Sequence, residues 1–301
     1  MSQPRDVGIS KPDTAQASTN NFDNSGPINN SNINVGSNIT QIISADQRSC
    51  PTPRPQPDHF GGRDHELNQL ITRLEVGQTT AIVAVQGLGG IGKTTLALQV
   101  AAQLYQQKIF RAVLWADVTS TPQPLILLQS WAAYADPNFQ IGDRPLSAVA
   151  NQIKGLLETT INDKCQQCEP ARILVVLDDV WDSGLEIARL LRLACPAQST
   201  ILITSRSEKI AINLGAKVEQ LGRLHPVEAA ALLRQYLPNT DQTLLEKLGE
   251  VLGGHPLALT LAAKRVLKAK NPAKALPLHL AKYIEKLPAG VEFKQLKLDQ
   301  G

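Results

Sequence analysis

The chain has 301 residues, 43% of them hydrophobic, and a formal net charge of +3. This length and composition predict one large or two modest domains with a real core. With so little net charge, no Lys/Arg run and only 4% aromatic residues, a nucleic-acid-binding surface is not expected. No apolar run reaches the roughly 20 residues of a membrane span, and the cysteines suit a reducing compartment, so we expect a cytoplasmic protein.

Residues 1–57 are polar, rich in Asn and Ser and then in Pro, and they predict a disordered tail without a packed core. Residues 51–57 alternate proline with polar residues, which predicts an extended spacer. Residues 28–43 alternate apolar side chains with Asn, Ser and Thr and contain neither charge nor proline. Because such segments can stack as in-register strands, two interpretations stay open for residues 24–45: a fibril-forming motif and a disordered low-complexity tail.

The globular part starts near His59, and its first predicted strand, residues 81–86, leads into a glycine-rich loop and a helix at residues 93–107. The loop GLGGIGKTT fits the phosphate-binding pattern G-x-x-x-x-G-K-[ST] in the strand–loop–helix context which that pattern requires. Its glycines let backbone N–H groups approach phosphate oxygens, and the helix N-terminus faces the same phosphates. We expect Lys93 to reach the β- and γ-phosphates and the Thr94 hydroxyl to ligate Mg²⁺. The predicted nucleotide-binding residues of the loop are Gly87, Gly89, Gly90, Ile91, Gly92, Lys93, Thr94 and Thr95.

A predicted strand at residues 111–118 and two helical stretches within residues 123–162 come next, followed by an apolar strand at residues 172–178 that ends in two carboxylates. Ligands in open α/β sheets bind at the carboxyl ends of the strands, so Asp178 is the predicted Mg²⁺ ligand, acting through water. Asp179 is a candidate catalytic residue that polarises an attacking water. The alternative is a strand-to-helix turn that an Asp side chain caps.

The remaining predicted elements of this region are a helix at residues 183–194, a strand at 199–204, a short helix at 208–214 and a strand at 217–221. If the strand at 199–204 lies between the strands at 81–86 and 172–178, Arg206 is close to the γ-phosphate, where a guanidinium suits phosphate recognition. Arg206 is therefore the second candidate catalytic residue, and a surface arginine is the alternative. Strands that alternate with helices predict an α/β fold, with a doubly wound parallel sheet of about five strands in a nucleotide-binding domain at residues 58–222.

Beyond Leu224 the sequence has no further strand pattern. The predicted helices lie near residues 226–237, 240–252, 256–270 and 272–286. They predict a small helical subdomain at residues 223–290 packed on the sheet domain, followed by a tail at residues 291–301.

The order of these motifs resembles the NB-ARC module of STAND-type signalling ATPases, which are P-loop NTPases, over residues 60–287. FGGRDHEL is similar to the opening signature of that family, GGIGKTT to its phosphate loop, DDVW to its acidic motif, TSR to its sensor strand and GGHPLAL to its Gly-x-Pro-Leu-Ala turn. The resemblance implies that ADP or ATP binds with Mg²⁺ between two domains, with adenine beside the backbone near Phe60 and against Pro256. The further nucleotide-binding residues that it implies are Phe60, Gly61, Gly62, Arg63, Pro256 and Leu257.

The sequence departs from the family pattern at its C-terminal side. The family continues into a winged-helix domain whose histidine contacts ADP; neither is found, since His279 lies too early and in the wrong context. We therefore expect a minimal version or a piece of a longer protein, with a weakened ADP-locked state. At the other end, INVG at residues 33–36 resembles the core of RHIM-type amyloid signalling motifs, which implies an effector protein with a matching motif.

The leading hypothesis is a signalling or defence switch that exchanges ADP for ATP and then self-associates, with slow ATP hydrolysis. The first alternative is a steady-turnover P-loop ATPase that acts on a macromolecular substrate, with Asp179 as the base and no second arginine finger to name. The second is a DNA-binding regulator, which the mild charge and the missing helix-turn-helix pattern do not support.

Overall fold

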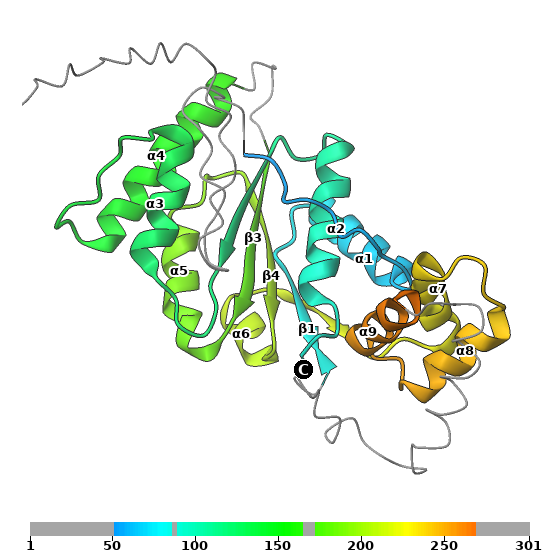
Figure 1. Cartoon of the computed structure of the whole chain (residues 1–301). Helices are drawn as coiled ribbons and strands as arrows, with labels where there is room; N and C mark the ends of the chain where they lie inside the picture. The colour runs from blue at the N-terminus through cyan, green and yellow to red at the C-terminus, as the bar shows by residue number, and fades with distance from the viewer. Residues whose placement is uncertain (1–50, 86–88, 165–171, 269–301) are drawn as a thin grey trace, which may run out of the picture. The chain divides into compact units, whose positions relative to one another are not determined.

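The structure is a computed structural model, and it describes residues 51–85, 89–164 and 172–268. Within these ranges a five-stranded parallel sheet carries helices on both faces, and α7, α8 and α9 form a bundle of their own (Figure 1). The elements of the sheet region are α1 (Asp64–Glu75), β1 (Thr80–Ala84), α2 (Lys93–Gln106), β2 (Ala112–Asp117), α3 (Pro124–Ala135), α4 (Leu146–Lys164), β3 (Ile173–Val180), η2 (Asp182–Gly184), α5 (Leu185–Leu193), β4 (Ser199–Ser205), α6 (Glu208–Asn213) and β5 (Lys217–Leu221). The elements of the bundle are α7 (Pro226–Tyr236), α8 (Gln242–Val251) and α9 (Pro256–Leu267).

The strands of the sheet lie in the order β2–β3–β4–β1–β5, and every adjacent pair is parallel. Every residue of β1 is buried, as expected for a strand that helices cover on both faces. Strand β4 lies between β1 and β3, so the strand before the phosphate loop, the strand that carries Asp178 and the strand before Arg206 are neighbours. The predicted α/β fold with a doubly wound parallel sheet of five strands is confirmed.

Alternate residues of the strands supply two hydrophobic cores, one on each face of the sheet. On one face, Ala81 and Val83 of β1 pack into a core shared with α3, α4, α5 and α6. On the other face, Ile82 and Ala84 pack with α1 and α2. Figure 1 shows these two helical layers on opposite sides of the strands. This alternation follows from the two-residue period of a strand, whereas the parallel pairing places the carboxyl ends of all five strands at the same edge of the sheet.

Helix α1 is an element that the sequence prediction omits. Its buried residues are Leu67, Leu70, Ile71 and Leu74. They recur at the three- and four-residue spacing of a helix with one apolar face, and they pack in the same core as α2. The helical period was therefore present in the sequence, within and just after the stretch that resembles the family's opening signature.

The sequence predicts residues 51–57 to be an extended spacer; in the structure they have no regular secondary structure and are attached to the sheet domain. The backbone N–H of Val113 in β2 donates to the carbonyl oxygen of Pro51 at 2.8 Å. Arg54 forms a two-pronged ion pair with Asp117, at 2.9 and 2.7 Å, and its guanidinium lies 4.8 Å from the ring centroid of Trp115. In Figure 1 the chain after residue 50 runs from β2 across α2 to α1.

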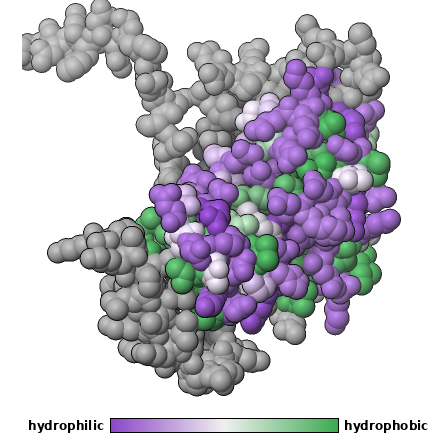
Figure 2. Space-filling model, turned by 90° about the vertical axis from the view of Figure 1, so that its right-hand side faces the viewer, coloured by the Kyte–Doolittle hydropathy of each residue, from purple (hydrophilic) through white to green (hydrophobic). Residues whose placement is uncertain are grey.

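The bundle has a core of its own, built from side chains of α7, α8 and α9. Seen from the bundle's side of the molecule, hydrophilic residues cover most of the described surface, and hydrophobic residues form small separate areas between them (Figure 2). Among the described residues, no helix is both long and apolar enough to cross a membrane. The fourth predicted helix at residues 272–286, the motif at 24–45 and the tail at 291–301 lie outside the described residues.

Candidate functional site

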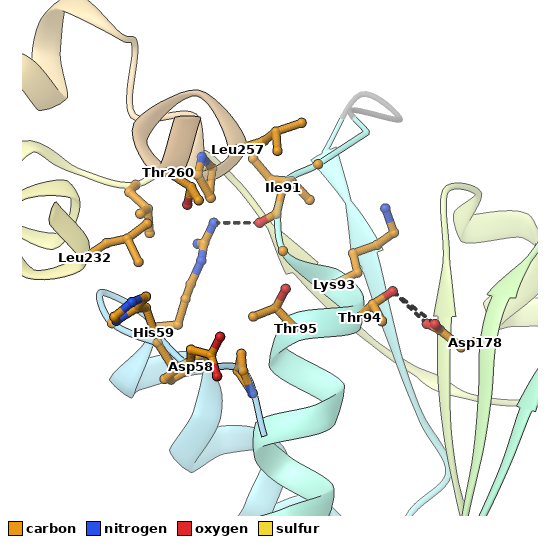
Figure 3. A pocket seen from close by; sticks show the side chains of 18 of the residues that line it. Asp58, His59, Ile91, Lys93, Thr94, Thr95, Asp178, Leu232, Leu257 and Thr260 are labelled. Atoms are coloured by element: carbon orange, nitrogen blue, oxygen red, sulfur yellow. Dashed lines mark hydrogen bonds between the residues drawn. The ribbon is translucent and has the colours of Figure 1, made fainter. Parts of the chain in front are cut away.

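A cavity of about 730 Å³ collects most of the predicted site residues. Its walls come from the phosphate loop and the start of α2, from the carboxyl ends of β2 and β3, from the segment before α1, and from α7 and α9 of the bundle. Figure 3 shows its two ends: Lys93, Thr94 and Asp178 lie at one, and Asp58, His59, Leu232 and Thr260 at the other, with Ile91 between them. We call these the phosphate end and the base end.

At the phosphate end, α2 begins with groups that are ready to bind an anion. Gly92 precedes the helix with φ 98°, a left-handed conformation that favours glycine. The first turn contains no acidic residue, and no side chain caps it. Its backbone N–H groups and the positive end of the helix dipole therefore remain available for phosphate oxygens. Gly87, which the pattern also predicts as a ligand, lies outside the described residues.

The Asp178 carboxylate lies beside the start of α2. It accepts hydrogen bonds from the Thr94 hydroxyl, at 2.9 and 3.1 Å, and from the Thr204 hydroxyl of β4. Burial raises the pKa of Asp178, and the two threonine hydroxyls oppose that rise. A buried carboxylate beside a hydroxyl is a donor set that Mg²⁺ accepts, so the residues present fit the predicted metal pair of Thr94 and Asp178. Within the described ranges, no three His, Cys, Asp or Glu side chains converge to hold a metal alone.

A β-bulge explains how two consecutive carboxylates reach the same cavity. In a regular strand Asp178 and Asp179 would point to opposite faces of the sheet. The pairing of β3 with β4 shifts register between Leu177 and Val180, and Asp179 has φ 50°. Its backbone N–H donates to the Thr204 hydroxyl at 2.9 Å, and its carboxylate accepts from the Trp181 indole at 2.9 Å. The bulge thus presents both carboxylates to the cavity, one buried and one half-buried.

Arg206 lies beside the phosphate loop. Its guanidinium stacks over Trp181, 4.5 Å from the ring centroid, and its Nε is 3.9 Å from the Asp179 carboxylate. A Cβ placed on Gly89 would lie 3.7 Å from Arg206 Nη1, so the arginine and the loop are neighbours. Burial, and secondarily Arg206, lower the pKa of the Lys93 ammonium. Two cations thus face the same end of the cavity, which is the electrostatic setting that an anionic ligand requires.

At the base end, the turn of Gly61 and Gly62 packs against the backbone of α7. A Cβ on Gly62 would lie 2.4 Å from the Glu228 carbonyl oxygen, and Gly62 has φ 74°. Arg63 is almost fully buried; it pairs with Glu66 at 2.6 Å and donates to the carbonyl oxygen of Gly222. The structure therefore shows these residues joining the start of α1 to the connection between β5 and the bundle, where the resemblance implies nucleotide contacts.

Of the predicted base-end residues, Gly62 is not among those that line the cavity, whereas the others line it: Phe60, Gly61, Arg63, Pro256 and Leu257. Phe60 precedes α1, and Pro256 and Leu257 begin α9. The cavity residues that the sequence prediction missed include Asp58, His59, Asp117, Tyr236, Thr260 and Lys264. Thr260 and Lys264 follow Pro256 at helical intervals of four residues, so the spacing on α9 could have indicated them. The ring centroids of His59 and Tyr236 lie 4.0 Å apart, and no local pattern joins those two residues.

Comparison with known proteins agrees with this geometry. The family model described as NB-ARC domain matches residues 63–242. The chain is 28% identical to disease resistance protein RPH8A of Arabidopsis thaliana over 215 residues, which are 67% of this chain and 22% of that protein. It is 29% identical to putative disease resistance protein RGA4 of Solanum bulbocastanum over 182 residues, 58% of this chain and 17% of that protein.

Among solved structures, that of the Aeropyrum pernix ORC2 protein, in ADPNP–ADP complexes, is similar with a TM-score of 0.54 at 17% identity and covers 79% of this chain and 71% of that one. This likeness shows the α/β P-loop NTPase fold. The family match covers more than half of the chain, so the chain belongs to the NB-ARC domain family. Family membership implies nucleotide binding. The chain spans about a fifth of the length of the two disease resistance relatives.

Proposed function

We propose that the chain binds ADP or ATP with Mg²⁺ in this cavity and acts as a nucleotide-dependent switch in signalling or defence. One observation carries the proposal: a single cavity is lined by the uncapped start of α2 at one end and by α9 of the bundle at the other. A nucleotide that contacts both ends makes the position of the bundle depend on the ligand. A ligand can shift a domain arrangement only through such differential contacts.

The phosphates of the nucleotide bind, in this proposal, to the backbone N–H groups of the loop and to the Lys93 ammonium. The Thr94 hydroxyl ligates Mg²⁺, and Asp178 holds the ion through water. Both side chains already meet in the structure, so ligation requires the hydroxyl only to exchange its carboxylate partner for the ion. When bound to these residues, the ion would help to neutralise the charge of the phosphates.

The base lies between the backbone of Phe60 and Gly61 and the start of α9, where Pro256 and Thr260 line the cavity. The bundle thereby supplies one wall of the base site, and the sheet domain supplies the other. Adenine specificity rests on the resemblance to the family pattern.

The γ-phosphate is the part of ATP that distinguishes the two states of the switch. Arg206 is the group best located to sense it, since its guanidinium lies beside Gly89 and its side chain is 44% exposed. A cation that gains a charge-assisted partner only with ATP gives the two nucleotides different interaction energies. Hydrolysis is expected to be slow, because Trp181 already occupies one oxygen of Asp179, the candidate base.

Self-association, a signalling or defence role and a cytoplasmic location extend the proposal to the whole protein. The defence role is supported by the names of the relatives, which are disease resistance proteins. Self-association rests on the family resemblance, and the location rests on the composition of the chain. An effector protein with a matching amyloid motif remains part of the proposal through the resemblance at residues 33–36. The second candidate function, a steady-turnover ATPase, is favoured only by the presence of Asp179 in the cavity.

The test is to purify the protein gently, denature it and identify the released nucleotide by ion-pair chromatography. Stoichiometric ADP would support a stored state of a switch. An empty site followed by turnover of ATP many times per second would replace the switch with the steady-turnover ATPase. Protein that neither carries nor binds any nucleotide would contradict both.

A further inference from the structure

The residue before α9 makes a contact to which the functions above assign no role. His255 Nε2 lies 3.0 Å from the carbonyl oxygen of Gly89, a residue of the phosphate loop that is 166 positions away in the sequence. The histidine side chain is buried, with 7% of the residue exposed. A carbonyl oxygen can only accept a hydrogen bond, so Nε2 carries the hydrogen and donates it.

The surrounding contacts show how closely α9 and the loop approach each other. A Cβ placed on Gly90 would lie 2.9 Å from the Leu257 side chain and 3.2 Å from Cε1 of His255. Gly90 has φ 70°, a conformation that glycine alone adopts without strain. The loop therefore fits against the start of α9 without space for a methyl group.

The hydrogen bond has a geometric consequence for the loop. A trans peptide is planar, and its C=O and N–H groups point in opposite directions. When His255 holds the Gly89 carbonyl toward α9, the N–H of Gly90 must point away from α9. Without that bond, the glycines on both sides of this peptide leave its orientation poorly determined. Loop N–H direction is what a phosphate-binding loop depends on.

We propose that His255 is a positioning residue that couples the phosphate loop to the helical bundle. When the bundle is docked, His255 orients the Gly89–Gly90 peptide for phosphate binding; when the bundle moves away, that orientation is lost. This inference rests on the proposed nucleotide site. It adds that the position of the bundle affects the affinity for phosphate through the loop, independently of the contacts that the bundle makes with the base.

Two substitutions separate the hydrogen bond from the bulk of the ring. His255→Gln places an amide N–H at nearly the reach of Nε2, and His255→Ala removes the donor. The chain offers a matched control in His225, which also precedes a proline at the start of a helix of the bundle but is exposed. His225→Ala alters the start of α7 in the same local context, and His225 is not among the nearest neighbours of Gly89 or Gly90.

The first measurement is the dissociation rate of a fluorescent ADP analogue in the presence of Mg²⁺. We expect His255→Ala to release it about tenfold faster than the unaltered protein, the factor that corresponds to one net hydrogen bond. His255→Gln and His225→Ala should stay within about twofold. Equal rates for all four proteins, or equal acceleration by Gln and Ala, would overturn the proposal.

The second measurement uses no nucleotide, so that a failed inference can be told from a failed nucleotide site. Amide hydrogen exchange at Gly90 and Ile91 should be faster in His255→Ala than in His255→Gln or His225→Ala, because the loop peptide loses its anchor. Unchanged exchange in His255→Ala would overturn the coupling even if ADP binds. Changed exchange in a protein that binds no ADP would keep the coupling and reject the nucleotide site.

Discussion

The two ends of the cavity are built in different ways. At the phosphate end, polar side chains meet one another: Thr94 and Thr204 both donate to Asp178. At the base end, backbone meets backbone, and Gly62 touches the Glu228 carbonyl so closely that a Cβ would overlap with it. The cluster of Asp178, Thr94 and Thr204 belongs to the sheet domain alone and persists if the bundle moves. A domain movement can act at the base end, which exists only while α7 and α9 are docked, and on the loop peptide that His255 contacts.

Removal of Lys93 should produce the largest effect, and it should be confined to ligand binding. Lys93→Ala deletes a buried cation that faces the phosphates. The loss of one or two charge-assisted hydrogen bonds, about 1.5–3 kcal/mol each, corresponds to at least about tenfold to hundredfold weaker ADP binding. Isothermal titration calorimetry measures this loss, and circular dichroism checks that the fold is retained.

A second lysine provides the control at the other end. Lys264 on α9 is exposed and lines the base end of the same cavity. Lys264→Ala removes the same charge and should change ADP affinity by less than about threefold, because exposed ion pairs contribute little. Equal losses of ADP affinity in the two variants, or no loss in Lys93→Ala, would contradict the assignment of the phosphates to the Lys93 end of the cavity.

A methyl group at Gly62 should produce the next largest effect, on docking of the bundle. Gly62→Ala brings a Cβ within 2.4 Å of the Glu228 carbonyl oxygen, at φ 74°. Backbone strain of roughly 1–2 kcal/mol adds to an overpacking cost of about 1–3 kcal/mol. Gly215 has φ 64° with open space around it, so Gly215→Ala isolates the strain. Chemical denaturation should show that the free energy of unfolding of Gly62→Ala is lower than that of Gly215→Ala by at least about 1 kcal/mol. Equal losses of unfolding free energy would mean that the close contact of Gly62 with α7 does not affect stability.

The comparison also explains how far the sequence predicts the site. The phosphate end is encoded locally, by a loop pattern and by Asp at the end of a buried strand, so its side chains could be assigned from residue type and order. The bulge that turns Asp179 toward the cavity could not be assigned, since it depends on a register shift between β3 and β4. The base end depends on contacts between distant segments, such as His255 with Gly89, which have no local pattern. Helix α1 was missed although its period is clear.

A smaller effect is expected where the segment before α1 is held to β2. Asp117 pairs with Arg54 of that segment and lies opposite Asp178 in the sheet register, so this ion pair connects the rim of the phosphate end to the chain that leads to the base end. We expect a coupling energy of about 1 kcal/mol for this partly buried, two-pronged pair. A double-mutant cycle of Arg54→Ala and Asp117→Asn, followed by urea unfolding, measures it. Asn keeps an acceptor for the Trp115 indole. Additive losses would show that the segment is held by its other contacts alone.

The smallest expected effect is the pH dependence of the contact between His255 and the phosphate loop. Burial lowers the pKa of His255, and the neighbouring Arg223 acts in the same direction, against the hydrogen bond to Gly89. The His255 imidazole therefore takes up a proton near pH 6.5 in the unfolded chain, whereas in the folded chain it takes up the proton only at lower pH. By linkage, the stability that this group contributes is present above the pKa of the unfolded state and is lost as the pH falls through the lowered pKa of the folded state.

The thermal midpoint of the nucleotide-free protein should fall between pH 7.0 and pH 5.5 by slightly more than that of His255→Gln, which cannot titrate. His225→Gln serves as the control for the loss of an exposed histidine, and an identical fall in all three proteins would show that docking of α9 on the phosphate loop does not depend on a neutral imidazole.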